Sequence, residues 1–137
     1  MDKRLFFLLS MAQRKLFNHL DKVCEKEFEA SVTQLAALLY LVKHQGCSQK
    51  ELAKAICLNK SAITGLIARM EKNDFVERIT DTEDARAMKL FPTPIGAQKA
   101  KDLIPYIDQL NELFSDEFSK EEIQTVLKFL NFIIQRF

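Results

Sequence analysis

The sequence predicts a mainly helical fold with one small β-hairpin. Only three glycines and three prolines interrupt 137 residues. Segments 31–34, 48–51 and 119–122 match the capping box, in which Ser and a Gln or Glu three positions later satisfy the free N–H groups at a helix start. Segment 76–91 instead shows the alternation of apolar and polar residues that is typical of two short strands.

Apolar residues spaced three and four positions apart predict six helices. These helices cover about 5–28, 33–44, 48–56, 59–73, 93–118 and 120–136. Thr93 is expected to cap the fifth helix, because Pro94 at the first helical position loses no hydrogen bond. Pro105 lies inside the same helix and is expected to bend it.

The two predicted strands, Val76–Thr80 and Arg86–Phe91, are joined by a charged turn. The third and fourth helices come before them, connected by the short link Cys57–Leu58. Two short helices followed by a hairpin form a winged helix-turn-helix. We therefore predict a mainly α fold with a small β-hairpin wing, in which long helices at both ends of the chain flank the winged helix-turn-helix.

The fourth helix has two distinct faces when its residues are projected at about 100° each. Its apolar face, expected to point to the core, consists of Ile63, Leu66, Ile67 and Met70. Its opposite face is small and mostly uncharged, with Ser61, Gly65, Ala68 and Lys72. Such a helix can enter a major groove while a hairpin tip reaches the adjacent minor groove. The alternative is an ordinary amphipathic surface helix.

The hairpin tip places Asp84 two residues before Arg86. An arginine that never loses its proton can enter a narrow groove of negative potential, and a neighbouring aspartate can orient its guanidinium. The alternative is a solvated turn of mixed charge.

Residues 48–100 resemble the MarR family of winged helix-turn-helix regulators. The matching segments are Leu52-Ala53, 59–64, 66–72, Asp81 with 84–87, and 93–96. The Asp84-x-Arg86 motif at the wing is the most family-specific of them. The resemblance implies a transcriptional regulator that binds double-stranded DNA.

The same resemblance implies roles for particular residues. The expected major-groove set is Asn59, Lys60, Ser61, Thr64 and Gly65. Arg86 would enter the minor groove with Asp84 holding it. The expected phosphate contacts are Ser48, Gln49 and Arg69.

Three positions depart from the family pattern. Asp74 replaces the usual glycine after the recognition helix, so Asn73 or Asp74 is expected to adopt the left-handed conformation. Gly65 occupies a position at which the family often has a larger polar or basic residue. Pro92 occupies a position at which the family often has leucine. A base preference is therefore not transferable from the family.

Nine of the eleven phenylalanines lie near the two ends of the chain. The last predicted helix is apolar most of the way round, which requires burial on most sides. We expect one domain, 1–137, with a head at 32–92 and dimerisation helices at 1–31 and 93–137. A two-fold homodimer would bind a pseudo-palindrome with half-sites about 10 base pairs apart. The alternative is a last helix that packs only within its own chain.

The net charge, the cysteine spacing and the length of the apolar runs limit which other classes of protein remain possible. The net charge is +1, and residues 48–101 hold ten Lys and Arg against seven Asp and Glu, a weak excess. No apolar run approaches the ~20 residues that span a bilayer, and the run at Leu5–Leu9 ends at Ser10 without a cleavage site. Three scattered cysteines suit a reducing compartment, so we expect a cytoplasmic protein without membrane contact.

Enzymatic chemistry finds no support in the sequence. It contains no Ser-His-Asp or Cys-His set and no phosphate-binding loop, and it has only two histidines. His19 and Cys24, five residues apart on a helix, do not point the same way, and no close pair of metal ligands occurs. We expect no catalytic residues, cofactor or metal.

The function expected from these observations is a ligand-responsive repressor that acts as a homodimer on DNA. Its small-molecule effector, of unknown identity, would bind in the cleft between the dimer helices and the head. One alternative is a winged-helix module that binds a protein instead of specific DNA. Another is a thiol-based redox sensor using Cys24 or Cys47, although Cys24 and Cys57 are more simply buried apolar residues.

Overall fold

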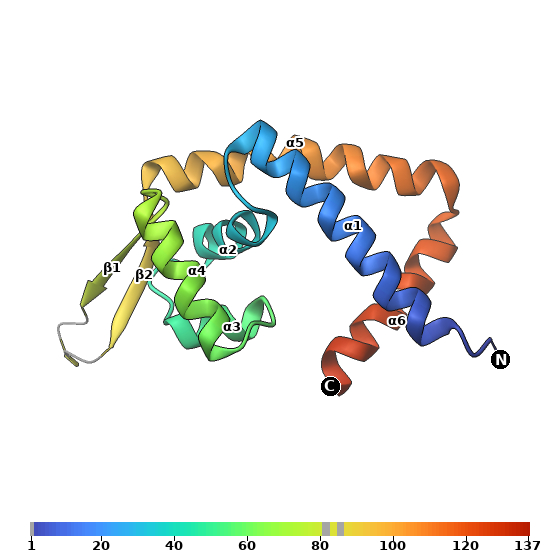
Figure 1. The fold of residues 1–137 in the computed structure, drawn as a ribbon, viewed down its shortest axis with the longest axis horizontal. Coiled ribbons are helices and arrows are strands. Elements are labelled where there is room, and N and C mark those ends of the chain that lie inside the picture. The colour runs from blue at the N-terminus through green and yellow to red at the C-terminus, as the bar shows by residue number, and fades with distance from the viewer. Residues whose placement is uncertain (1, 81–82, 85–86) are drawn as a thin grey trace. The chain divides into compact units, whose positions relative to one another are not determined.

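A computed structural model describes residues 2–80, 83–84 and 87–137 of the chain. Its elements in order are α1 (Leu5–Phe28), α2 (Val32–Lys43), α3 (Gln49–Ala55), α4 (Lys60–Lys72), β1 (Val76–Thr80), β2 (Met88–Pro92), α5 (Pro94–Glu117) and α6 (Lys120–Arg136) (Figure 1). The predicted fold class, mainly helical with a two-stranded hairpin, is confirmed. The chain forms two compact units that meet within α5, between Asp102 and Leu103.

Serine caps begin three of the helices, as the sequence predicts. The Ser31 hydroxyl accepts from Gln34 N at 3.1 Å, and the Gln34 side chain accepts from Ser31 N at 3.1 Å. Ser119 and Glu122 form the same reciprocal pair at the start of α6. Ser48 accepts from Glu51 N at 3.0 Å without a return bond, so only half of the predicted capping box forms at α3.

The core of the first unit lies where α2, α3, α4 and β2 meet. Its fully buried large side chains include Leu35, Leu38, Leu41, Leu52, Ile63, Leu66, Ile67, Met70 and Leu90. The four apolar residues predicted to face inward from α4 are all among the buried residues of that helix. Because this face is fixed in the core, the opposite face of α4 must point to solvent.

The wing is an antiparallel pair in which Val76 lies opposite Pro92 and Thr80 opposite Met88. The second strand begins at Met88 rather than at the predicted Arg86, which lies outside the described residues. Ala87 belongs to the turn, since its N–H donates to Asp84 O at 3.0 Å. The strand also pairs on its other side with the segment before α3, where Leu90 N donates to Cys47 O at 2.9 Å.

Among the described residues, three other than glycine adopt the left-handed conformation in the first unit's connections, namely Glu29 at the end of α1, Cys57 and Asp74. Asp74 has φ 60°, whereas Asn73 has φ −84°, so Asp74 takes the position of the missing glycine. Cys57, in the link between α3 and α4, has φ 58°. The expectation that Cys57 is buried was wrong, because this turn holds its side chain at the surface.

The second unit contains the end of α5 and the whole of α6. No residue of α6 is buried within the chain. Pro105 lies inside α5, where its missing N–H removes one bond of the helix ladder, and the bend expected there stays a prediction. Among the described residues, no helix has both the length and the apolarity to cross a membrane.

Candidate nucleic-acid interface

The first turn of α4 presents polar side chains in a defined arrangement. Asn59 caps the helix, its Oδ1 accepting from Ala62 N at 2.8 Å, and both Lys60 and Ser61 are exposed directly after it. The Thr64 hydroxyl donates to Lys60 O at 2.8 Å and accepts from Gln49 Nε2 at 3.0 Å. The structure thus brings four of the predicted major-groove residues together and links them to Gln49 on α3.

The middle of the same face carries no side chain at Gly65. Gly65 is half-buried, and a Cβ atom added there would meet Arg69 Nη1 at 3.3 Å. The guanidinium of Arg69 therefore lies back along α4 over the space that a larger side chain would fill. This places a permanent positive charge at the edge of the surface formed by Ser61 and Thr64.

The hairpin is connected to α4 at its base. Arg78 on β1 pairs with Glu71 on α4, with Nη2 and Oε1 2.5 Å apart. Asp84 is exposed in the turn, whereas Arg86 lies outside the described residues. The predicted pairing of Asp84 with Arg86 therefore stays a prediction.

The two predicted phosphate contacts on α3 lie at its first turn. Ser48 precedes the helix and its hydroxyl oxygen accepts from Glu51 N, which leaves the hydroxyl hydrogen for another acceptor. Gln49 is half-buried through its bond to Thr64. Gln49 therefore borders the first turn of α4.

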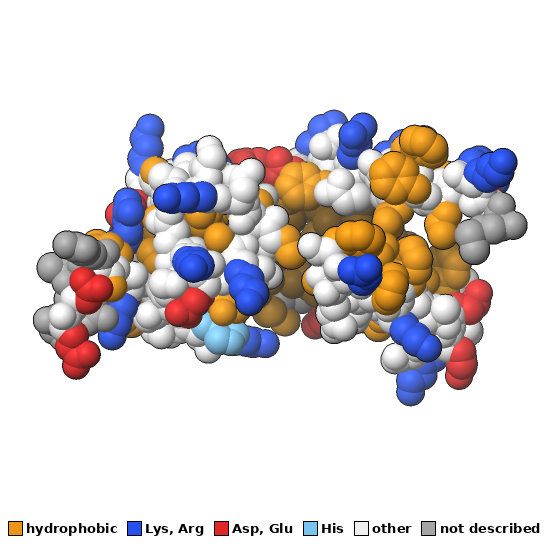
Figure 2. Space-filling view, turned by 90° about the horizontal axis from the view of Figure 1, so that it is seen from below, with side chains coloured by type: hydrophobic (Ala, Val, Ile, Leu, Met, Phe, Trp, Pro, Cys, Tyr) orange, Lys and Arg blue, Asp and Glu red, His pale blue; other side chains and the backbone are white. Residues whose placement is uncertain are grey.

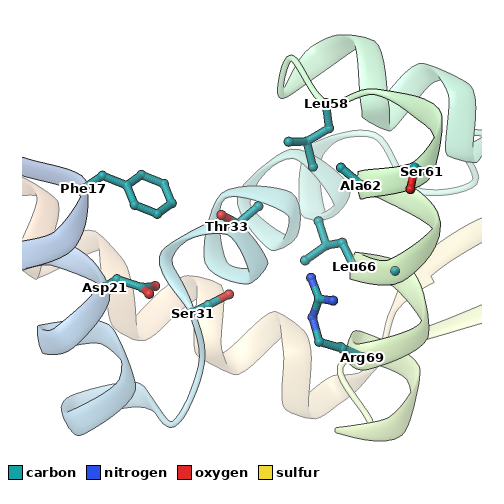
Figure 3. Close-up of a pocket in the computed structure, with 10 residues that line it drawn as sticks. Phe17, Asp21, Ser31, Thr33, Leu58, Ser61, Ala62, Leu66 and Arg69 are labelled. Carbon is teal, nitrogen blue, oxygen red and sulfur yellow. The ribbon is translucent and has the colours of Figure 1, made fainter. Parts of the chain in front are cut away.

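A cavity of about 390 Å³ lies between α1 and α4 (Figure 3). Phe17 and Asp21 project into it from α1, and Leu66 and Arg69 from the opposite side. The remaining lining residues are Ser31, Thr33, Leu58, Ser61, Ala62 and Gly65. Asp21 also accepts from Val32 N at 2.9 Å and so holds the start of α2 in place.

The three cysteines differ in exposure, and Cys57 is the exposed one. Cys24 and Cys47 are buried, and burial raises the pKa of both thiols, with nearby carboxylates adding to the shift. A raised pKa lowers the thiolate fraction at neutral pH, which weighs against the thiol-sensing alternative. In the described part of the chain, no group of three His, Cys, Asp or Glu residues is placed to hold a metal ion.

Comparison with known proteins matches residues 30–88 to the model of the MarR family. The chain is 23% identical over 129 residues to the HTH-type transcriptional regulator BilQ of Clostridioides difficile, covering 94% of this chain and 86% of that protein. Residues 30–88 of the chain are therefore of the MarR type. Its matched region contains α2, α3, α4 and β1, which carry the candidate interface.

Solved structures of MarR proteins share the fold. S. aureus MepR in complex with DNA superposes with a TM-score of 0.86 at 22% identity, covering 95% of each chain. PcaV from Streptomyces coelicolor, in complex with its natural ligand, gives a TM-score of 0.79 at 21% identity and covers 96% of this chain and 89% of its own. The relatives are named as transcriptional regulators, which agrees with the expectation that the chain is not an enzyme.

Sequence reasoning missed part of the surface around α4. It did not name Phe17 or Asp21, which lie four residues apart on one face of α1 and line the cavity. It also did not name Lys50 and Lys54 on α3. The spacing of each pair shows that its members share a helix face, but only the packing of α1 and α3 on α4 shows what that face meets.

Proposed function

We propose that this chain is a sequence-specific transcriptional regulator that places α4 in the major groove of double-stranded DNA. The exposed polar start of α4, held by the Asn59 cap and the bond between Gln49 and Thr64, is the observation that supports this most directly. Its buried face packs in the core of the first unit, so the exposed groups are held rigidly. The wing would reach the minor groove through Arg86, with Asp84 orienting it.

We propose further that the regulator acts as a homodimer. Many large apolar side chains of the second unit remain exposed in a single chain, including Leu113, Phe118, Val126, Phe132, Ile134 and Phe137. The face shown in Figure 2 also carries uncovered hydrophobic side chains. Apolar surface on this scale indicates a protein interface. A two-fold dimer would bind a pseudo-palindromic operator with half-sites about 10 base pairs apart.

We also propose that the regulator is a repressor and that a small molecule releases it from DNA. The cavity between α1 and α4 supports this, because Gly65 and Arg69 belong both to its lining and to the DNA-facing set. A ligand there needs only to favour one placement of α4 over another. The relative PcaV was solved in complex with its natural ligand.

Selection from a random duplex library tests the proposal. The purified full chain, Arg86→Ala and the control Arg136→Ala, which removes a positive charge far along the sequence, are compared at two salt concentrations. We expect a pseudo-palindromic consensus, affinity that falls with salt and a roughly tenfold or greater loss for Arg86→Ala alone. Equal weak binding to all duplexes, unchanged by Arg86→Ala, would contradict the proposal and favour the protein-interaction module.

A further inference from the structure

We propose that Gln49 sets a base preference of α4 by holding the Thr64 hydroxyl as a hydrogen-bond acceptor. The inference rests on the proposed function and concerns one contact in the major groove. Gln49 is the first residue of α3, and its Nε2 donates to Thr64 Oγ1 at 3.0 Å. The base that faces Thr64 should then carry an amino group in the major groove, as adenine and cytosine do and guanine and thymine do not.

The Thr64 hydroxyl has a single hydrogen, and this hydrogen is already in use. A hydroxyl group offers one donor and two lone pairs. The hydrogen goes to Lys60 O at 2.8 Å, and one lone pair accepts from the Gln49 amide. Within the described residues, these are the two hydrogen bonds that the Thr64 side chain makes. The exposed hydroxyl can therefore offer a base one lone pair.

The Gln49 amide fixes this orientation through the place where it donates. Because it occupies one lone pair of Thr64 Oγ1, the side of that oxygen toward Lys60 O must carry either the hydrogen or the second lone pair. A lone pair there would set two oxygens 2.8 Å apart with no hydrogen between them, which is repulsive. The hydrogen therefore stays on Lys60 O while the Gln49 bond is made.

Without the Gln49 amide, the Thr64 side chain is free to turn. Threonine in a helix divides between two rotamers, because its hydroxyl can bond a carbonyl oxygen of the preceding turn. The bond from Gln49 ties Thr64 to that rotamer from a different helix. In the other rotamer Oγ1 leaves Lys60 O, and its hydrogen becomes available to a base. Loss of Gln49 thus changes Thr64 from an acceptor into a group that can donate or accept.

The two classes of base differ at the atom that an acceptor would meet. Adenine N6 and cytosine N4 are amino groups that donate into the major groove, whereas guanine O6 and thymine O4 accept there. An amino base can donate to the remaining lone pair of Thr64 Oγ1. A keto base would place a second acceptor against it, and both oxygens would lose water without gaining a partner. The contact therefore disfavours both keto bases and does not separate adenine from cytosine.

This role of Gln49 differs from the phosphate contact that the family resemblance implies. A residue that contacts only phosphate contributes equally on every sequence, and its loss reduces the salt dependence of binding. A positioning residue acts through the side chain that meets the base, so its loss relaxes the preference at one base pair of each half-site. The two roles predict different results for the same substitution.

Selection from a random duplex library with the full chain, followed by affinity measurements on matched duplexes, tests the inference. We expect one position of each half-site to hold adenine or cytosine on one strand, with at least about fivefold weaker binding when guanine or thymine replaces it. Gln49→Leu should reduce this ratio to about one without reducing the salt dependence. Gln98→Leu is the matched control, because it removes an amide that donates to Asp102 on α5, and it should keep the wild-type consensus.

Two substitutions of Thr64 identify the position and the atom involved. Thr64→Ala should lose the preference at the same base pair as Gln49→Leu. Thr64→Ser keeps the hydroxyl and should retain the preference for an amino base. A thymine preference that Thr64→Ser loses would indicate a contact through the threonine methyl group and would overturn the inference. So would a Gln49→Leu variant that binds every duplex more weakly by the same factor with a smaller salt dependence, because Gln49 would then be a phosphate contact only.

A change on the DNA side gives a readout on the wild-type chain itself. 2-Aminopurine in place of adenine, or 2-pyrimidinone in place of cytosine, lacks the amino group in the major groove. This exchange at the selected position should weaken binding by the wild type about fivefold and have little effect on Thr64→Ala. Equal losses for the two proteins would overturn the inference.

NMR of the free chain tests the orientation of Thr64 apart from DNA. Three-bond couplings at Thr64 should report one χ1 rotamer in the wild type and an average of two in Gln49→Leu. An average in the wild type would overturn the inference. If the chain selects a consensus in which no position separates amino from keto bases, the proposed function stands and the inference fails. If the chain selects no consensus at all, the proposed function fails, and the base preference fails with it.

Discussion

Gly96 on α5 lies directly against the backbone of Phe75. A Cβ atom added to Gly96 would sit 2.1 Å from the Phe75 carbonyl oxygen and 2.9 Å from Leu38 Cδ2. Because the first of these neighbours is backbone, it cannot move aside as a side-chain end can. This contact holds the start of α5 against the connection between α4 and the wing.

Gly96→Ala should therefore lower the free energy of unfolding by about 2 kcal/mol or more, since α5 or the segment at Phe75 must shift. Gly65→Ala is the matched control, because its new methyl group would meet only the flexible end of Arg69. Alanine at position 65 should raise stability by about 0.5–1 kcal/mol through helix propensity. Denaturant unfolding at one protein concentration measures both. Equal effects of the two substitutions would contradict the close contact at Gly96.

Thr93 reinforces the same junction through its hydroxyl group. The side chain is buried, and Oγ1 donates to Asp74 O at 2.5 Å and accepts from Gly96 N at 3.0 Å. Thr93→Val keeps the shape but leaves both backbone groups without this partner, so we expect a loss of about 1–3 kcal/mol in unfolding free energy. Thr93→Ser keeps the hydroxyl and should retain most of the stability. A valine variant as stable as the serine variant would show that these bonds contribute little.

The three cysteines should separate into two kinetic classes toward a thiol reagent such as DTNB. Cys57 is exposed, whereas Cys24 and Cys47 are buried with raised pKa values. At neutral pH we expect one fast thiol per chain and two slow ones, and all three fast in denaturant. Because a raised pKa keeps the buried thiols protonated, the slow rates should increase as pH rises through about 9 and above.

Cys57→Ser identifies the fast thiol, since it should remove that phase and leave the slow phases unchanged. A fast phase that persists in Cys57→Ser would place a reactive thiol at Cys24 or Cys47. That outcome would restore the redox-sensing alternative.

Local chemistry explains which parts of this fold the sequence could predict. The starts of α2 and α6 follow from Ser31 with Gln34 and Ser119 with Glu122, because a capping box involves residues only three apart. The buried face of α4 follows from its spacing, and the left-handed Asp74 from a missing glycine. Each of these features depends on neighbours along the chain.

Features that depend on tertiary contacts were harder to predict. Cysteine gives no sign of a left-handed turn, so the exposure of Cys57 was not foreseen. The half-formed cap at Ser48 shows that a motif permits a bond without ensuring it. The cavity beside Arg69 combines residues from separate helices, which no single segment of the sequence reveals.

The exposed apolar surface of α6 leads to a prediction about assembly. Phe132 is 60% exposed within one chain, so replacing it removes little packing from that chain. Phe132→Glu would place a charge in the proposed dimer interface, where it would have to lose water without a partner. We expect sedimentation velocity to show a dimer for the wild type and largely monomers for Phe132→Glu at the same concentration. The variant's unfolding temperature should also fall and no longer depend on protein concentration.

Gln135→Glu is the matched control, because it adds the same charge to the same helix at an exposed polar position. It should remain a dimer with wild-type stability. A monomeric wild type, or a Phe132→Glu variant that dimerises as the wild type does, would contradict a dimer built on this face of α6. Loss of the dimer in both variants would instead indicate that general repulsion with the acidic residues of the second unit, rather than the burial of Phe132, controls association.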